Sequence, residues 1–193
     1  ETPTPRFATH FLPSLNRTIL LNERRAWRLR LYICIDEGDL LYAHLNSTEN
    51  ASSLLPGVEL RRVLWTRGSV IPHGLTAELA FTDGAAYVHR TNDYTEYLTA
   101  GWISLATNTL RAFGNVGVVG PKVWGDGFRP GLLTLDCVHR THLTLFRHYY
   151  PPVFSNWYVD DWISAVYGNR SKRIRQWEAR HVFVRYRRYA PSV

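Results

Sequence analysis

Two periodicities of apolar and polar residues succeed one another along this chain. Apolar residues recur at steps of three and four between positions 7 and 20, which predicts an amphipathic helix. Continuous apolar runs follow at 29–35 and 58–65, and each predicts a buried strand. Segment 44–57 lies between these two strands and is rich in Asn, Ser, Pro and Gly, so we expect an exposed loop there.

The same alternation continues to the end of the chain. A turn is predicted at 72–74, a short helix at 75–81, a strand at 86–91 and a long helix after Asp93 that ends at Gly114. Further strands are predicted at 116–121, 132–137 and 182–186, helices at 139–150 and within 155–167, and a loop at 125–131. Alternating strands and helices are typical of an α/β domain with a mostly parallel central sheet. We predict a single domain over residues 1–193.

The composition is that of a folded protein. Hydrophobic residues make up 45% of the 193 positions and aromatic residues 13%, which is enough for one well-buried core and excludes a disordered chain. No apolar run approaches the roughly 20 residues that span a bilayer, so we expect no membrane span in this segment. The chain opens at Glu1 without a basic and apolar leader, so we expect a signal or anchor to be absent or already removed.

Positive charge is concentrated near the end of the chain. The net charge is +7, and residues 169–189 contain eight basic residues against Glu178 alone, so the remainder is neutral. The basic residues are Arg170, Lys172, Arg173, Arg175, Arg180, Arg185, Arg187 and Arg188. Such a segment predicts either an anionic partner, such as phosphate, nucleic acid or a membrane surface, or a solvated basic face.

Cysteines and sequons bear on the compartment. Cys34 and Cys137 lie far apart without metal-binding spacing, so a zinc site built on thiolates is not expected. Four N-x-[ST] sequons begin at Asn16, Asn46, Asn50 and Asn169. That number exceeds the chance expectation of roughly one, and it favours the lumen of the secretory pathway (Golgi), with the cytoplasm as the alternative.

Acidic and amide side chains follow two of the predicted strands. Asp36 and Asp39 come just after the 29–35 strand, and Asn92 and Asp93 come just after the 86–91 strand. Open α/β sheets bind ligands beyond the carboxyl ends of their strands. Both positions are therefore candidate binding sites, although turn formation alone also accounts for Asn and Asp there.

A third acidic pair opens a helical pattern. Asp160 and Asp161 precede an aromatic and apolar run, at a helix N-terminus that favours negative charge. Capping explains one carboxylate, whereas two indicate a chemical role. Among the histidines, His181 stands before the last predicted strand, and His139 and His142 share one face of the predicted 139–150 helix. The latter two are candidates to flank an acceptor or to pair as ligands, and packing is their alternative role.

In their order and spacing, these motifs resemble the nucleotide-sugar-dependent glycosyltransferases of the GT-A fold, particularly family-2-like sequences. The matching segments are Ile35-Asp36-Glu-Gly-Asp39, Thr91-Asn92-Asp93 and Val159-Asp160-Asp161-Trp162. The resemblance spans nearly the whole chain and implies a GT-A-like (Rossmann-like) sheet flanked by helices. The resemblance also leads us to expect that the chain starts after the first strand of that fold.

The resemblance also implies roles for single residues. The nucleoside contact falls to Asp36 or Asp39, and Mn²⁺ or Mg²⁺ on the diphosphate falls to Asp93 beside Asn92. His181 then completes the metal coordination. The base that deprotonates the acceptor hydroxyl of a glycan or other acceptor falls to Asp161 or its neighbour Asp160. We expect an enzyme that transfers a sugar with inversion, using Asp161 as the base.

Tyr94 departs from the pattern, because members of this group often carry a second Asp at that position. One alternative is therefore a pseudoenzyme that binds a nucleotide sugar without transferring it. A second is a nucleic-acid-binding domain that uses the basic segment with Trp177, Tyr186 and Tyr189 as stacking groups. It is not favoured, because no recognised nucleic-acid motif accompanies these residues.

Overall fold

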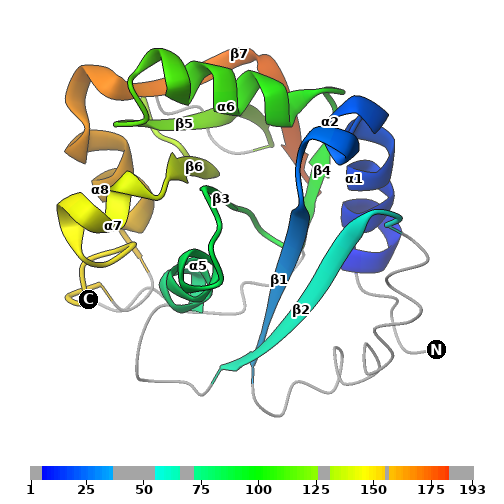
Figure 1. The fold of residues 1–193 in the computed structure, drawn as a ribbon, viewed down its shortest axis with the longest axis horizontal. Helices are drawn as coiled ribbons and strands as arrows, with labels where there is room; N and C mark the ends of the chain where they lie inside the picture. Colours follow the sequence, from blue (N-terminus) through cyan, green and yellow to red (C-terminus); the bar gives the residue numbers. More distant parts are fainter. Residues whose placement is uncertain (1–5, 37–54, 66–71, 126–130, 155–156, 183–193) are drawn as a thin grey trace.

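The computed structural model describes residues 6–36, 55–65, 72–125, 131–154 and 157–182. Within these ranges the protein is an α/β domain in which helices flank a curled, mixed sheet and a smaller parallel one (Figure 1). The predicted loops at 44–57 and 125–131 lie largely outside the described residues.

The N-terminal segment is helical, as predicted. A π-helical turn, η1 (Phe7–Phe11), continues into α1 (Leu12–Thr18), and α2 (Leu21–Ala26) follows. Glu23 is 1% exposed, and its carboxylate accepts hydrogen bonds from the backbone N–H groups of Leu20 at 3.0 Å and Ser104 at 2.7 Å. This acid therefore caps α2 and connects it to α6 (Trp102–Ala112), a helix that packs on the main sheet.

The first two predicted strands form a parallel pair. β1 (Leu29–Asp36) pairs with β2 (Val58–Trp65) in a register that sets Leu29 opposite Val58. Next comes α5 (Pro72–Thr82), which starts three residues earlier than predicted and replaces the expected turn. Proline suits the first turn of a helix because the missing N–H would have no partner there.

The main sheet has five strands in the order β3-β6-β5-β7-β4. Their bounds are β3 (Tyr87–Arg90), β4 (Thr95–Tyr97), β5 (Val118–Trp124), β6 (Asp136–His139) and β7 (Ser171–His181). Only β5 and β7 are parallel, and the other three pairings are antiparallel. The expected mostly parallel sheet is therefore not what the described residues form. The strand predicted at 132–137 overlaps β6, but the alternation of strands and helices did not predict that β6 runs antiparallel to β3 and β5.

Two of these strands have no counterpart in the sequence prediction. β4 has three residues and lies where the start of a long helix was expected. In β7, the buried positions Ile174, Trp177 and Ala179 are not evenly spaced, because the register against β5 shifts between Pro121 and Lys122. A bulge of this kind breaks the period of two. The strand ends at His181, where a strand was expected to begin, and 183–186 lie outside the described residues.

Three more helices cover the two faces of the main sheet. α6 (Trp102–Ala112) lies on one face, while α7 (Thr141–Phe146) and α8 (Val159–Val166) lie with α5 on the other (Figure 1). α7 ends at Phe146, before Arg147 with its φ of 64°, so it is shorter than the predicted 139–150 helix. His139 belongs to β6 and not to that helix.

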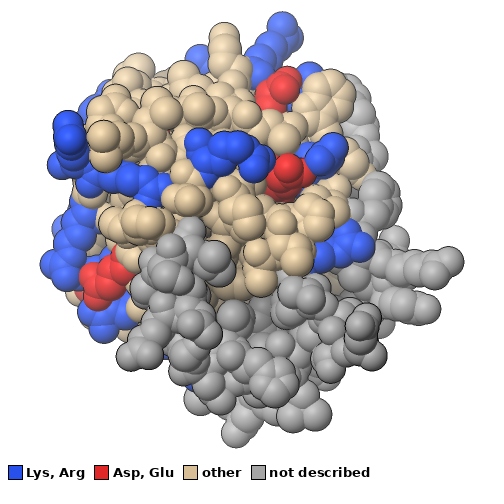
Figure 2. All heavy atoms as spheres, turned by 90° about the vertical axis from the view of Figure 1, so that its right-hand side faces the viewer, with Lys and Arg blue, Asp and Glu red and all other residues tan. Residues whose placement is uncertain are grey.

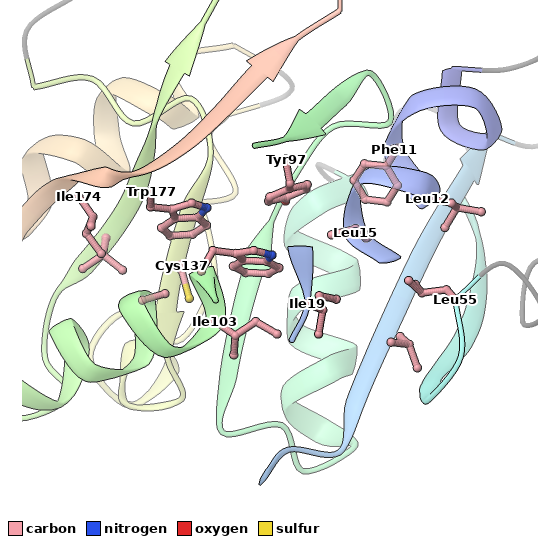
Figure 3. Packing of buried hydrophobic residues seen from close by; sticks show 14 of the residues in the cluster. Phe11, Leu12, Leu15, Ile19, Leu55, Tyr97, Ile103, Cys137, Ile174 and Trp177 are labelled. Carbon is pink, nitrogen blue, oxygen red and sulfur yellow. The ribbon is translucent and has the colours of Figure 1, made fainter. Parts of the chain in front are cut away.

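One hydrophobic cluster joins both sheets. Its side chains extend from Ile174 and Trp177 through Tyr97 to Phe11 and Leu55 (Figure 3). The ring of Trp102 stacks on Trp177 with centroids 5.2 Å apart and an interplanar angle of 13°. Large aromatic rings contribute much of the apolar area that a core removes from water. A shared core explains why the two sheets belong to a single domain.

Three basic residues in and just before β7 make contacts within the protein. Arg170 donates to the Phe113 carbonyl at 2.7 Å, Arg173 to the Leu132 carbonyl at 2.6 Å, and Arg180 to Glu96 at 2.5 Å. Arg185, Arg187 and Arg188 lie outside the described residues. Lys and Arg side chains are also scattered over the face that carries the N-terminal helices (Figure 2). Basic side chains therefore also lie on a surface outside the 169–189 segment.

Other features follow from burial. Cys137 is buried and Cys34 is half-buried, and neither forms a disulfide. The sequon residues Asn16 and Asn169 are both exposed, and the Asn16 side-chain oxygen also accepts a hydrogen bond from Arg24. None of the helices among the described residues has the length and apolar character needed to cross a membrane.

Candidate functional site

A cleft of ≈ 1270 Å³ opens between β1 and the main sheet. Its walls include β1, the start of α5, the segment after β3, the start of α8 and the end of β7. Five of the side chains predicted for the site line it, namely Asn92, Asp93, Asp160, Asp161 and His181. The fold therefore gathers residues from three distant parts of the sequence into one concave surface, the usual shape of a small-molecule site.

Hydrogen bonds and a ring contact fix the segment after β3 in place. The amide nitrogen of Asn92 donates to the Tyr94 hydroxyl at 3.1 Å, and the Thr95 N–H donates to the Asn92 carbonyl at 3.1 Å. The Tyr94 ring packs edge-on against the His181 ring, with centroids 4.8 Å apart. The Val182 N–H donates to the Tyr94 carbonyl at 2.9 Å. Tyr94 thus joins the end of β3 to the end of β7.

The donor atoms near Asp93 limit the kind of metal site that the cleft could form. Within the described ranges, no group of three or more His, Cys, Asp or Glu side chains is arranged to hold a metal ion. Asp93 and His181 line the cleft, and Tyr94, the residue after Asp93, packs against His181. Mg²⁺ is commonly held by one or two carboxylates with substrate phosphates and water. This donor set fits such a shared ion and does not fit a metal enclosed by protein alone.

The two carboxylates of α8 have different surroundings. Asp160 is partly buried and accepts a hydrogen bond from Arg90 Nη2 at 2.5 Å, whereas the neighbouring Asp161 is exposed. Burial raises the pKa of Asp160 above its usual value, and the charge of Arg90 offsets only part of that effect. Both lie in the first turn of the helix, where the backbone favours negative charge.

A buried ion network lies behind these carboxylates, and the sequence analysis did not predict it. Arg90 Nε donates to Asp136 at 2.7 Å, and the hydroxyls of Tyr149 and Tyr150 donate to the same carboxylate at 2.5 and 2.8 Å. Burial alone would raise the pKa of Asp136, but Arg90 and the two hydroxyls outweigh it and hold that pKa below the usual value.

One signal was available in the sequence. Asp136 stands within the apolar run 132–138, where an unpaired charge would be very costly. A buried acid of this kind requires a cationic partner, and Arg90 at the end of a strand was a candidate. The sequence alone does not say that the two strands are neighbours.

The two histidines expected beside an acceptor do not line the cleft. His142 is 0% exposed, and its ring nitrogens bond to the Tyr167 hydroxyl at 2.7 Å and the Tyr149 carbonyl at 2.9 Å. His139 packs against the Tyr87 ring. Both have packing roles in this structure, and they do not share a helical face because they belong to different elements.

The first acidic motif is described only in part. Asp36 is the last residue of β1, opposite Trp65, and the preceding residues Cys34 and Ile35 line the cleft. Asp39 lies outside the described residues. The cleft also receives His73, which was not predicted as a site residue. Burial and the charge of Arg90 lower the pKa of His73 to about 4.

Comparison with known proteins adds no assignment. The chain matches no protein-family model, and it matches no curated protein. The functional argument therefore depends on the cleft and its side chains.

Proposed function

We propose that this protein is a glycosyltransferase of the GT-A type that moves a sugar from a nucleotide-diphosphate donor to an acceptor hydroxyl, with inversion. The observation that carries the proposal is the convergence of Asn92-Asp93, Asp160-Asp161 and His181 on one cleft. The first two belong, in the same order, to the segments on which the resemblance to that family is based, and His181 is the metal ligand that the resemblance implies.

Asp161 is suited to the role of general base. It lines the cleft, is exposed, and begins the helix α8. A carboxylate within hydrogen-bond reach of an acceptor hydroxyl takes its proton as the oxygen attacks the sugar carbon. The bond between that carbon and the diphosphate oxygen breaks, and the electron pair leaves with the nucleoside diphosphate. Attack from the face opposite the leaving group inverts the carbon.

The donor side of the cleft supplies the other half of the reaction. Mn²⁺ or Mg²⁺, held by Asp93 and His181 together with diphosphate oxygens, would neutralise charge on the leaving group. Asn92 lies beside Asp93, and its amide is oriented by the Tyr94 hydroxyl. The end of β1, with Asp36, is the expected side for the nucleoside.

A second candidate function depends on Tyr94. Its ring is packed against His181 where a second acid would otherwise stand. A thinner metal site fits a pseudoenzyme that binds the nucleotide sugar without transferring it. A nucleic-acid-binding role is disfavoured, because Arg170, Arg173 and Arg180 already make contacts within the protein.

The test of metal-dependent nucleotide binding is thermal stabilisation by UDP and GDP, with and without Mn²⁺, beside single-stranded nucleic acid. We expect one diphosphate to stabilise the protein only with Mn²⁺, because ligand binding to the folded state raises its stability. Asp93→Ala should weaken that shift, whereas Glu59→Gln, outside the cleft in a surface cluster with Arg30, should not. Absence of a metal-dependent shift would overturn the proposal.

Catalysis is tested separately with Asp161→Asn. The variant should keep its Mn²⁺-dependent nucleotide shift and lose turnover of UDP-glucose or GDP-mannose by about 10²–10⁴-fold, the usual contribution of a general base. Retained turnover would rule out Asp161 as the base. A nucleotide shift without any turnover in the unsubstituted protein would favour the pseudoenzyme.

A further inference from the structure

The ion network behind the cleft connects three elements that are distant in sequence. Arg90 at the end of β3 contacts Asp136 at the start of β6 through Nε, at 2.7 Å, and Asp160 in α8 through Nη2, at 2.5 Å. The side chains of Arg90, Asp136 and Asp160 are 6%, 0% and 30% exposed, respectively. One guanidinium therefore serves a fully buried carboxylate and a carboxylate at the cleft wall.

Arg90 is fixed from behind. It stands directly opposite Asp136 in the antiparallel β3–β6 ladder, so the two side chains lie on the same face of the sheet. Both carboxylate oxygens of Asp136 accept hydrogen bonds, from Tyr149 on one side and from Arg90 and Tyr150 on the other. Asp136 is thus enclosed by donors and has no route to a substrate.

The front of the guanidinium holds only one of the two neighbouring acids. Consecutive residues of an α-helix point about 100° apart, so a contact that fixes Asp160 turns Asp161 in a different direction. Asp160 is held by Arg90, and Asp161 is exposed in the cleft. The geometry distinguishes between two acids that the sequence leaves equivalent.

We propose that Arg90, held by Asp136, is a positioning residue that pins Asp160 and so presents Asp161 alone to a substrate hydroxyl. The role of Asp161 toward the hydroxyl rests on the proposed function, whereas the pinning of Asp160 does not. The planar guanidinium is essential, because its rigid fork reaches two carboxylates at once. A lysine would keep the charge at that site but not the fixed double contact.

Carboxyl labelling tests the pinning without any assay of activity. The probe is a water-soluble carbodiimide with glycinamide, and labelling of each residue is followed by mass spectrometry. Asp161 should be labelled and Asp160 protected in the unsubstituted protein. Arg90→Lys should raise labelling of Asp160 several-fold and leave Asp93 unchanged.

The matched control is Arg17→Lys, the same substitution in an exposed pair with Glu96 at 3.4 Å, outside the cleft. It should leave labelling of both acids unchanged. Equal labelling of Asp160 and Asp161 in the unsubstituted protein, or no change in Arg90→Lys, would overturn the proposal.

A second variant keeps the proposal testable if Arg90→Lys does not fold. Asp160→Asn retains an oxygen that accepts from Arg90, so Asp161 should keep its orientation and its labelling. Turnover of UDP-glucose or GDP-mannose should then fall far less in Asp160→Asn than in Asp161→Asn. The opposite order would show that Asp160 is the reacting acid and overturn the proposal.

Kinetics separate positioning from substrate binding. In Arg90→Lys, kcat should fall on the order of 10²-fold, the effect of a misplacement near 1 Å, while KM for the donor changes little. A rise in KM at constant kcat would instead mean that Arg90 binds the donor. If the unsubstituted protein turns over no nucleotide sugar, the proposed function fails, and labelling of Asp160 still decides whether Arg90 pins it.

Discussion

Both faces of the main sheet bury an apolar cluster, but only one of them also buries an ion network among the described residues. β3 presents His89 to the face covered by α6 and Arg90 to the other, and β6 presents Cys137 and Asp136 in the same alternation. On the α6 face the neighbours are stacked aromatic rings (Figure 3). On the opposite face, apolar residues of α5 and α8 surround a guanidinium, two carboxylates and two tyrosine hydroxyls.

Apolar packing and the buried ion network contribute differently to the stability of the fold. Stacked apolar side chains stabilise the fold with few directional demands, whereas buried charges are costly unless each is paired and hydrogen-bonded. Buried ion networks rarely stabilise a protein more than apolar packing would. The cleft is lined from both faces, and the ion network reaches it through Arg90 and Asp160. We infer that the network is kept for the position it gives to that acid.

Breaking the charged face should have the largest effect. Asp136→Ala leaves Arg90 partly uncompensated and two tyrosine hydroxyls without their acceptor, so the free energy of unfolding should fall by about 3–5 kcal/mol. Urea denaturation measures it. The double variant Asp136→Leu with Arg90→Met should cost less than the sum of the single variants, because no unpaired charge remains between them. An additive cost would mean that the network is not one unit.

Close packing on the same face gives a smaller effect. A Cβ at Gly120 would lie 2.2 Å from the backbone oxygen of Leu135 and 3.2 Å from the Leu133 side chain. Gly120→Ala must therefore push β5 away from the segment before β6, and the free energy of unfolding should fall by about 1–3 kcal/mol. An unchanged urea midpoint would show that this part of the sheet is loosely packed.

On the aromatic face, the test is the pH dependence of stability. His89 bonds to the Asp136 carbonyl at 2.8 Å and the Tyr97 hydroxyl at 2.7 Å, and burial lowers its pKa from 6.5 to about 4. Between these values the unfolded chain binds more protons than the folded one. Stability should be complete above pH 6.5 and decline as the pH falls toward 4, by at most about 1.4 kcal/mol per pH unit for this group.

His89→Gln isolates that contribution. The variant has no titratable group at this position, so its free energy of unfolding should depend less steeply on pH between 4 and 6.5. Part of the slope should remain, because the pKa of His73 is also lowered to about 4. Identical slopes in the two proteins would mean that His89 is solvated enough to titrate normally.

The smallest expected change is a gain. Gly74 lies in α5 and faces the ring of Tyr150, and a Cβ there would meet the nearest ring atom at 3.9 Å, an ordinary contact. Gly74→Ala should raise the free energy of unfolding by about 0.5–1 kcal/mol, because alanine loses less backbone entropy in a helix. A loss instead would show that α5 sits too tightly on the charged face to accept one methyl group.

Long periodic patterns were the most predictable part of the fold. The helical start, β1 and β2 were predicted from their apolar spacing, and the segment after β3 was singled out from Asn92 and Asp93. β4 was missed because three residues carry no usable period, and β7 because its bulge disturbs the alternation. The sequence predicts a turn at 72–74 because of its proline, although proline also suits the first turn of a helix.

The acidic motifs were visible in the sequence, but their division of labour was not. Asp93, Asp160, Asp161 and His181 were each chosen from local context, and the cleft unites them. His139 and His142 satisfied the same local criteria and do not line that cleft. A histidine's role depends on its neighbours in space, and spacing along the chain did not identify Tyr167 as the partner of His142.

By itself, the sequence determined the α/β class, the extents of the strongly periodic elements and the positions where acids follow apolar runs, because these depend on neighbours along the chain. Only the tertiary structure decided the strand directions and the contact of Arg90 with Asp160. Arg90 is 46 residues from Asp136 and 70 from Asp160. Contacts over such separations depend on the order of the strands, which periodicity does not encode.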